Sequence, residues 1–345
     1  MYRDIVPKPD FQNSEWASIV LAGGCFWGVE AWFKRLRGVL ATECGYANGA
    51  DTDTSYQTLA ATDHSEAVSI WYDPIIIPLP DLLDLFLQII DPYSLNRQGN
   101  DVGRQYRTGI YYIDEADRDV ALAKLAELEQ SSGRKPAVEV EPLQNYVRAE
   151  AYHQDYLAKN PGGYCHIDID AIPQAWLKPS FDATQLKEKD LAVAEAKQPE
   201  LTRRVMLESG TERPFSSPLD QEYAPGLYVD RITGEPLFLS STKFSGGCGW
   251  PSFALPLDDA LTYHEDHSLG RSRIEVRSKA GDYHLGHVFR DGPQDMGGLR
   301  YCINGAALKF IPYDELSANG YSAYIPFVKP YVEAIAALTE KSDDT

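Results

Sequence analysis

The 345-residue sequence contains no Cys-x-x-Cys pair, although it has five cysteines. Tetrahedral zinc sites are usually built from such pairs, so a zinc site of that spacing is excluded. Five cysteines scattered along a chain of this length are also too few for a disulfide scaffold. We therefore interpret them as reactive or buried thiols.

A long uninterrupted apolar segment is also missing. The longest apolar region, 68–90, is broken by prolines and aspartates, so it cannot span a bilayer. The first residues lack the apolar centre of a signal peptide, and we therefore expect either a cytoplasmic location or a chain that has lost its leader. Basic residues are few, because 32 Lys and Arg stand against 51 Asp and Glu, for a net charge of −19. This charge argues against nucleic acid or an anionic membrane as partner.

Length and a hydrophobic content of 43% predict two domains with packed cores. Residues 18 to about 170 alternate strand-like and helix-like segments, which indicates an α+β domain. The region beyond about 205 has short strands separated by turn residues, which predicts a mainly-β domain. Between them lies a polar, proline-punctuated stretch with a short helical segment at 184–197. The predicted division is 1–172 for the first domain, 173–200 for the linker and 201–345 for the second domain.

Cys25 follows an apolar strand-like run and two glycines, and it precedes a segment with apolar residues at helical spacing. A thiol at a helix N-terminus faces unpaired N–H groups and the positive end of the helix dipole. We therefore expect the pKa of Cys25 to be lowered, which would make this residue a nucleophile near neutral pH. A buried cysteine that packs as a small hydrophobe is the alternative, and the residues alone leave both open.

A nucleophilic thiol needs a group that exchanges protons with it. Glu66 begins an apolar strand, where burial would raise the pKa of its carboxyl and make it a general acid near pH 7. Most glutamates at strand starts are solvated, so this signal is weak alone. Tyr56 and the loop 99–107 offer further hydrogen-bonding groups, and Phe26 with Trp27 would suit a small apolar group such as a methyl.

Six separated motifs in the first half closely resemble methionine sulfoxide reductase A, over about residues 16–170. They are Gly24–Gly28, Tyr56, His64–Val68, Gln98–Gly103 with Gln105–Arg107, Tyr152–Tyr156, and Gly163–Cys165.

The resemblance implies a ferredoxin-like α+β sandwich and a role for each matching residue. Cys25 would attack the sulfoxide sulfur, and Cys165 would be the resolving cysteine on a mobile glycine-rich loop. The remaining matches form two groups. The polar partners of the sulfoxide oxygen would be Glu66, Tyr56, Tyr106 and Asp101. The walls of the methyl pocket would be Phe26 and Trp27. Cys44 matches no functional position, and we expect it to be structural.

The second half contains its own candidate chemistry. Cys248 lies in a glycine-flanked loop, and Cys302 lies between strand-like residues. His284 and His287 form a His-x-x-His pair, which is a candidate metal site but lacks a third ligand at suitable spacing. As acid–base partners of a nearby thiol, these histidines make better chemical sense.

These motifs resemble methionine sulfoxide reductase B, over about residues 201–325. The anchors are Gly210–Phe215, Gly247–Phe253, His264–Asp266, Glu275–Ser278, the histidine pair and the segment around Cys302.

The resemblance makes Cys302 the nucleophile, His287 the proton donor and Cys248 the resolving thiol. His284 and Asn304 would be polar supports, and Trp250 would be the wall of the methyl pocket. Members of this family that hold a structural zinc use four cysteines. The matching positions here are Asp230, Thr233, Arg277 and Ala280, which cannot bind zinc, and we expect Asp230 to face Arg277 in its place.

The favoured hypothesis is a bifunctional reductase without metal or cofactor, recycled by thioredoxin or a similar dithiol. One domain would reduce the S epimer of methionine sulfoxide and the other the R epimer, free or in proteins. The alternatives are another thiol enzyme, such as a peroxidase or a disulfide reductase, and a non-catalytic redox-sensing or peptide-binding module. The aromatic neighbours of the cysteines argue against the first, since peroxide needs no methyl pocket.

Overall fold

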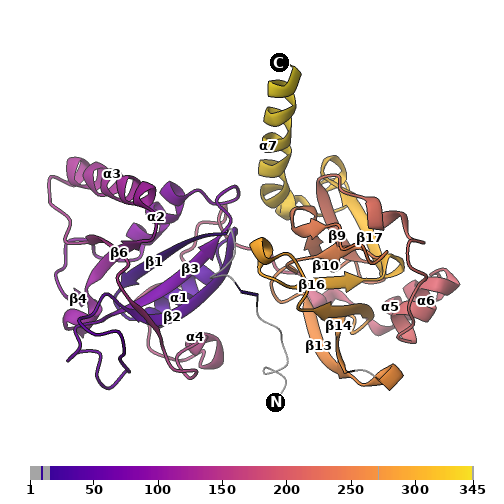
Figure 1. Ribbon diagram of the computed structural model, residues 1–345, viewed down its shortest axis with the longest axis horizontal. Coiled ribbons are helices and arrows are strands. Elements are labelled where there is room, and N and C mark those ends of the chain that lie inside the picture. Colours follow the sequence, from indigo (N-terminus) through magenta and orange to yellow (C-terminus); the bar gives the residue numbers. More distant parts are fainter. Residues whose placement is uncertain (1–8, 11–15, 271, 344–345) are drawn as a thin grey trace. The chain divides into compact units, whose positions relative to one another are not determined.

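Strand β1 (Ala17–Gly23) lies inside the first sheet and leads directly to the turn that carries Cys25 (Figure 1). The computed structural model describes residues 9, 10, 16–270 and 272–343. The chain divides into two compact units, Trp16–Lys178 and a second one formed by Met1–Glu15 with Pro179–Thr345. Each unit has its own hydrophobic core.

The first unit has a six-stranded sheet in the order β7-β6-β1-β3-β2-β8. Its pairs are antiparallel except β6 with β7, which is parallel. The other strands are β2 (Val39–Ala47), β3 (Ser65–Tyr72), β6 (Thr108–Tyr112), β7 (Glu139–Pro142) and β8 (Tyr146–Arg148), and a separate pair is β4 (Arg97–Gln98) with β5 (Asp101–Val102).

Helices add to this sheet. They are α1 (Phe26–Lys34), α2 (Leu79–Gln88), α3 (Glu115–Ser132) and the short α4 (Tyr156–Lys159). Apolar residues of α1 and α2, among them Trp32, Phe33 and Phe86, pack with the sheet residues Ile19 and Val68 in one core. The α+β class predicted for this half is confirmed.

The second unit has two antiparallel sheets. The smaller has the order β10-β9-β17, and the larger has the order β11-β12-β16-β15-β14-β13. Their strands are β9 (Gly226–Asp230), β10 (Pro236–Leu239), β17 (Leu308–Pro312), β11 (Lys243–Phe244), β12 (Ser252–Phe253), β13 (Leu261–Asp266), β14 (Arg273–Ser278), β15 (His284–Phe289) and β16 (Arg300–Ile303). Aromatic side chains join the sheets, since Phe238 of β10 stacks on Phe253 of β12 with ring centroids 4.3 Å apart. The mainly-β prediction is confirmed.

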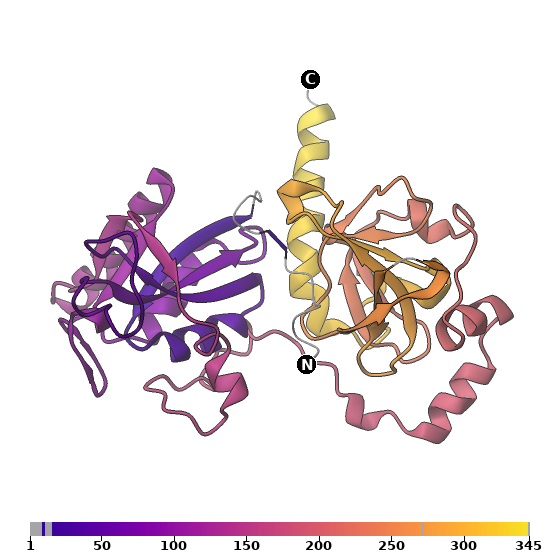
Figure 2. The same cartoon turned by 60° about the horizontal axis from the view of Figure 1, so that its bottom comes forward.

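The α-helices in the described part of this second unit are α5 (Glu188–Ala196), α6 (Glu200–Leu207) and α7 (Ile325–Asp343). Figure 2 shows α5 and α6 as two successive pink helices at the edge of the second unit. The helix predicted at 184–197 is thus shorter, and α6 begins where we expected the second domain to start. Val205 and Met206 of α6 are buried in the core, and the Tyr283 hydroxyl donates to Glu195 of α5 at 2.5 Å. The predicted boundaries at 172 and 201 stay a prediction. None of the described helices has the length and apolar content needed to cross a bilayer.

Candidate active sites

Cys25 is the residue that directly precedes helix α1, as the sequence predicts. The preceding Gly24 has a φ of +85°, and a Cβ there would lie 2.5 Å from the Cβ of Gln98. Only glycine meets both conditions, so this turn depends on residue 24. Only 6% of Cys25 is exposed.

The predicted low pKa of Cys25 is wrong for this structure. Burial raises the pKa of the thiol well above its usual value, and the negative charge of Glu66 raises it further. The backbone of Trp27, in the first turn of α1, lowers the pKa and is outweighed. Removal from water therefore dominates over the effect of the helix N-terminus.

Glu66 lies on β3 with 1% of its surface exposed. Its Oε2 accepts a hydrogen bond from the backbone N–H of Phe26 at 3.1 Å, which places the carboxyl beside the first turn of α1. Burial raises the pKa of Glu66 to about 8. The carboxyl is therefore mostly protonated at neutral pH, as the sequence predicts.

The two aromatic residues after Cys25 have different surroundings. Phe26 is 1% exposed and packs in the core, whereas Trp27 is partly buried and stacks on Tyr156 with ring centroids 3.7 Å apart. The indole Nε1 of Trp27 donates to Nδ1 of His153 at 3.1 Å. The ring of Tyr56, which is 40% exposed, lies 4.7 Å from the same imidazole. His153 and Tyr156 were missed as site residues, although both lie in a motif used for the family resemblance.

The polar residues predicted to surround the sulfoxide oxygen lie close together. Burial raises the pKa of the Tyr56 and Tyr106 hydroxyls, and the charge of Glu66 raises both further. Asp101 adds to the negative potential at Cys25, Glu66 and Tyr106. The structure therefore brings together all the polar residues predicted for this site.

Cys165 lies over the first turn of α1. A Cβ placed on Gly28 would lie only 2.7 Å from its sulfur, and the thiol donates to the carbonyl of Ile167 at 3.1 Å. Cys165 and Cys25 are both free thiols here. Cys44 is fully buried in the core, in agreement with a structural role.

In the second unit, five residues lie in register across four neighbouring strand pairs. Ser252 is paired with Cys302, Cys302 with His287, His287 with Glu275, and Glu275 with His264. Side chains paired in this way share one face of a sheet. The predicted nucleophile and the predicted proton donor are thus cross-strand neighbours.

Each histidine of the His-x-x-His pair has a carboxylate partner. Nε2 of His287 lies 2.7 Å from Oδ2 of Asp266, and Nδ1 of His284 lies 2.5 Å from Oε1 of Glu275. Burial lowers the pKa of His287, and the hydrogen bond to Asp266 opposes this effect. The described residues contain no group of three or more His, Cys, Asp or Glu side chains able to hold a metal ion.

The sulfur atoms of Cys248 and Cys302 lie 3.6 Å apart. Burial and the neighbouring Cys248 raise the pKa of Cys302 to about 12. Burial also opposes ionisation of Cys248, but the surrounding polar groups of Ser252, Trp250, Cys302 and Arg300 together outweigh it, so the pKa of Cys248 is lowered.

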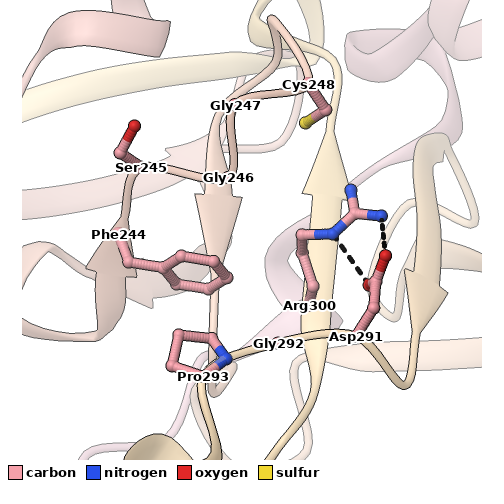
Figure 3. Close-up of a pocket in the computed structure, with 9 residues that line it drawn as sticks. All are labelled: Phe244, Ser245, Gly246, Gly247, Cys248, Asp291, Gly292, Pro293 and Arg300. Atoms are coloured by element: carbon pink, nitrogen blue, oxygen red, sulfur yellow. Dashed lines mark hydrogen bonds and ion pairs between the residues drawn. The ribbon is translucent and has the colours of Figure 1, made fainter.

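A cavity of about 420 Å³ lies beside the Cys248 loop (Figure 3). Arg300 and Asp291 line it and face each other through two hydrogen bonds of 2.9 and 2.8 Å. The charge of Arg300 favours ionisation of both Cys248 and Cys302. Arg300 was missed as a site residue, because nothing in its local sequence indicates which thiol it approaches.

The side chains of Trp250 and Asn304 both form hydrogen bonds with the backbone of Glu212. The Trp250 indole donates to the Glu212 carbonyl at 3.3 Å, and Oδ1 of Asn304 accepts from the Glu212 N–H at 3.0 Å. The Asn304 amide nitrogen donates to the carbonyl of Leu285 at 2.9 Å. Asn304 is 4% exposed and supports the backbone around the site.

Two of the four positions matched to zinc ligands, Asp230 and Thr233, lie in one hydrogen-bonded turn. Oδ1 of Asp230 accepts from the N–H groups of Ile232 and Thr233, both at 2.8 Å. The expected pairing of Asp230 with Arg277 is wrong, since Arg277 pairs with Glu275 and Asp282. Asp230 is 1% exposed, and backbone N–H groups satisfy its Oδ1, whereas its buried Oδ2 has no hydrogen-bond partner among the described residues.

Comparison with known proteins matches each unit to a family. A family model described as peptide methionine sulfoxide reductase matches residues 17–185, and one described as SelR domain matches residues 199–312. Among solved structures, reduced Mxr1 from Saccharomyces cerevisiae is 39% identical over 43% of this chain and 88% of that chain, with a TM-score of 0.42. Methionine sulfoxide reductase A of Corynebacterium diphtheriae is 33% identical over 43% of this chain and 76% of that chain, with a TM-score of 0.40. Mxr1 in complex with Trx2 is 28% identical over 41% of this chain and 84% of that chain, with a TM-score of 0.29.

The two family matches together take up most of the chain, and each includes one of the two cysteine sites described above. The chain therefore belongs to the methionine sulfoxide reductases, with an A-type domain followed by a B-type SelR domain.

Proposed function

We propose that the A-type domain reduces the S epimer of methionine sulfoxide and the SelR domain the R epimer, each through a sulfenic acid and then a disulfide. The observation that carries this proposal is that each domain pairs a thiol with a proton-exchanging side chain: Cys25 with Glu66, and Cys302 with His287. Sulfoxide sulfur is chiral, so a mixed oxidised pool requires two sites of opposite handedness.

In the A-type domain, the Cys25 sulfur attacks the substrate sulfur and the sulfoxide oxygen passes to Cys25. Glu66, protonated at neutral pH, gives its proton to that oxygen and recovers one from the thiol. Tyr56 and Tyr106 hydrogen-bond the oxygen, and Asp101 organises this polar side. Methionine leaves and Cys25 remains as the sulfenic acid, while Trp27 and Phe26 hold the methyl group.

In the SelR domain, Cys302 is the nucleophile and His287 exchanges the proton. Its Nε2 bonds Asp266, which leaves Nδ1 as the nitrogen that takes up and returns a proton. His284 and Asn304 support the polar side, and Trp250 bounds the methyl pocket.

Resolution follows in both domains. The thiol of Cys165 attacks the sulfenic acid of Cys25, and Cys248 attacks that of Cys302. A sulfur–sulfur bond forms, the sulfur–oxygen bond breaks, and the thiol proton leaves with the hydroxyl as water. A dithiol protein of the thioredoxin type then reduces each disulfide. No metal or cofactor takes part in these steps, and the cytoplasmic location stays a prediction.

Separated S and R sulfoxides, offered free and within a peptide, test the assignment with dithiothreitol as reductant. We expect Cys25→Ser to lose the S epimer and keep the R epimer, and Cys302→Ser to do the reverse. Cys44→Ala is the matched control and should keep both. Loss of both epimers through one substitution would contradict two independent sites.

A further inference from the structure

The residue after the resolving cysteine has contacts that the proposed chemistry does not use. Nε2 of His166 lies 3.1 Å from the carbonyl oxygen of Gly23, the last residue of β1. Gly23 is only two positions before Cys25, so this contact joins the Cys165 segment to the turn that carries the nucleophile.

Space for the imidazole is provided by two glycine turns. A Cβ on Gly24 would lie 3.2 Å from Cε1 of His166, and a Cβ on Gly99 would lie 3.0 Å from its Cβ. Gly24 precedes Cys25 and Gly99 precedes Asp101, so the ring lies between the two loops that form the site. The His166 side chain is 6% exposed.

Other contacts also hold this segment: Ile167 is 7% exposed and packs in the core, and Nη1 of Arg35 donates to the carbonyl of Ile169 at 2.5 Å. It has no regular secondary structure between α4 and residue 170, and a glycine pair precedes Cys165. Tyr164 donates to Oδ2 of Asp101 at 3.1 Å, and Tyr164 is 44% exposed. His166 is the residue of this segment that hydrogen-bonds to the turn of Cys25, whereas Tyr164 is exposed.

One ring nitrogen of His166 lacks a partner. Nδ1 is buried and forms no hydrogen bond among the described residues, and it lies 3.8 Å from Oδ2 of Asp101. This is the same oxygen that accepts from Tyr164. A buried polar atom without a partner is unfavourable, so an arrangement that gives it one is favoured.

From these contacts we infer that His166 is a positioning residue for the resolving step. This inference rests on the proposed function of Cys165 as the resolving thiol. By its bond to Gly23, His166 holds the neighbouring thiol over the first turn of α1, within reach of the Cys25 sulfenic acid. The effect is one of local concentration, because a tethered thiol reacts faster than a mobile one.

The test uses the full chain with Cys302→Ser, so that only the A-type domain reacts. A single turnover with the S sulfoxide is quenched with an alkylating reagent at successive times. Methionine is quantified, and the Cys25–Cys165 disulfide is measured by intact mass. His166→Phe keeps a ring without a donor, and His166→Gln keeps an amide donor at a similar reach.

We expect His166→Phe to release methionine at the wild-type rate but to form the disulfide about tenfold more slowly, as expected for the loss of one orienting hydrogen bond. His166→Gln should recover most of that loss. Wild-type disulfide formation in His166→Phe, or equal slowing of both steps, would overturn the inference. If the Cys302→Ser background itself released no methionine, the proposed function would fail first.

Discussion

The sulfur atoms of Cys248 and Cys302 lie 3.6 Å apart while both thiols are free. A disulfide has a sulfur–sulfur distance of about 2.05 Å, so a displacement of about 1.5 Å suffices to join them. The flexible glycines on both sides of Cys248 make such a movement easy. The resolving thiol of the SelR domain thus lies close enough to Cys302 to form the disulfide without a loop rearrangement.

Replacement of Cys248 by serine should therefore separate reduction from recycling. We expect Cys248→Ser, in a Cys25→Ser background, to release one equivalent of methionine from the R sulfoxide and then to stop with thioredoxin as reductant. The sulfenic acid of Cys302 should accumulate and react with a dimedone-type trap. Ser245→Ala in the same loop is the control. Unchanged steady-state turnover would refute the pairing of Cys248 with Cys302.

Asp266 should tune the proton donor of the SelR domain. Its hydrogen bond raises the pKa of His287 against the lowering effect of burial, so Asp266→Asn should lower that pKa further. The rate of R-epimer reduction should then begin to decline at a lower pH. At neutral pH the rate should fall about tenfold for each unit by which the pKa of His287 is lowered. Single-turnover rates across pH, with an NMR titration of His287, measure the shift. Glu265→Gln on the same strand is the control, and an unmoved profile would exclude this role.

The buried acid of the A-type domain should destabilise it at alkaline pH. The pKa of Glu66 is about 8 in the folded state, against a usual value of 4.5. A carboxyl with a raised folded-state pKa contributes stability below pH 4.5, and this is lost as the pH rises towards 8. Glu66→Gln should thus unfold at a higher temperature than wild type at pH 8.5. The gain in the free energy of unfolding should be about 1.4 kcal/mol for each unit by which folding raises the pKa of Glu66.

Calorimetry of the A-type transition at pH 5 and pH 8.5 tests this expectation. The exposed Glu141→Gln serves as control, because its side chain carries no burial penalty. A wild-type protein equally stable at both pH values would argue against an ionisable Glu66 in the interior.

Gly28 should be required for the position of Cys165 more than for folding. Alanine favours a helix over glycine by about 1 kcal/mol, but its Cβ would lie 2.7 Å from the Cys165 sulfur. That sulfur ends a side chain able to rotate away, so we expect Gly28→Ala to retain stability and to form the Cys25–Cys165 disulfide more slowly. Gly162→Ala, where a Cβ meets nothing within 4 Å, should leave the disulfide rate unchanged. Equal rates in both variants would show that Cys165 does not depend on this space.

The SelR domain should be stable to chelation, because a buried carboxylate occupies a position at which relatives bind zinc. We expect EDTA to leave its melting temperature unchanged. Asp230→Ala should destabilise it by about 2 kcal/mol, since two backbone N–H groups lose their acceptor. The exposed Asp314→Ala is the control. A chelator-dependent loss of stability would contradict a metal-free turn.

The sequence was sufficient for the strand–turn–helix around Cys25 and the raised pKa of Glu66, because both follow from local pattern and burial. It was insufficient for the pKa of Cys25, which depends on how completely the fold removes the thiol from water and on Glu66, which is distant in the sequence. The pairing of Arg277 with Glu275 and Asp282 likewise depends on a tertiary choice among several carboxylates.

Helix α7 was missed for a different reason. Its sequence contains Pro326 and Pro330, which usually indicate a break. Proline is tolerated in the first turn of a helix, which accounts for Pro326, whereas Pro330 lies inside α7 and removes one intrahelical N–H donor. The apolar residues Phe327 and Val328, both buried, could have indicated this helix.

Cys302 faces His287 only because β15 and β16 pair in one register. Neighbouring residues of a strand point to opposite sides, so a slip of a single position would send the thiol and the imidazole to different faces of the sheet. A misassembled hairpin would then be catalytically silent rather than merely slow. Turnover of the R sulfoxide is therefore a direct count of correctly assembled SelR domains in any refolded preparation.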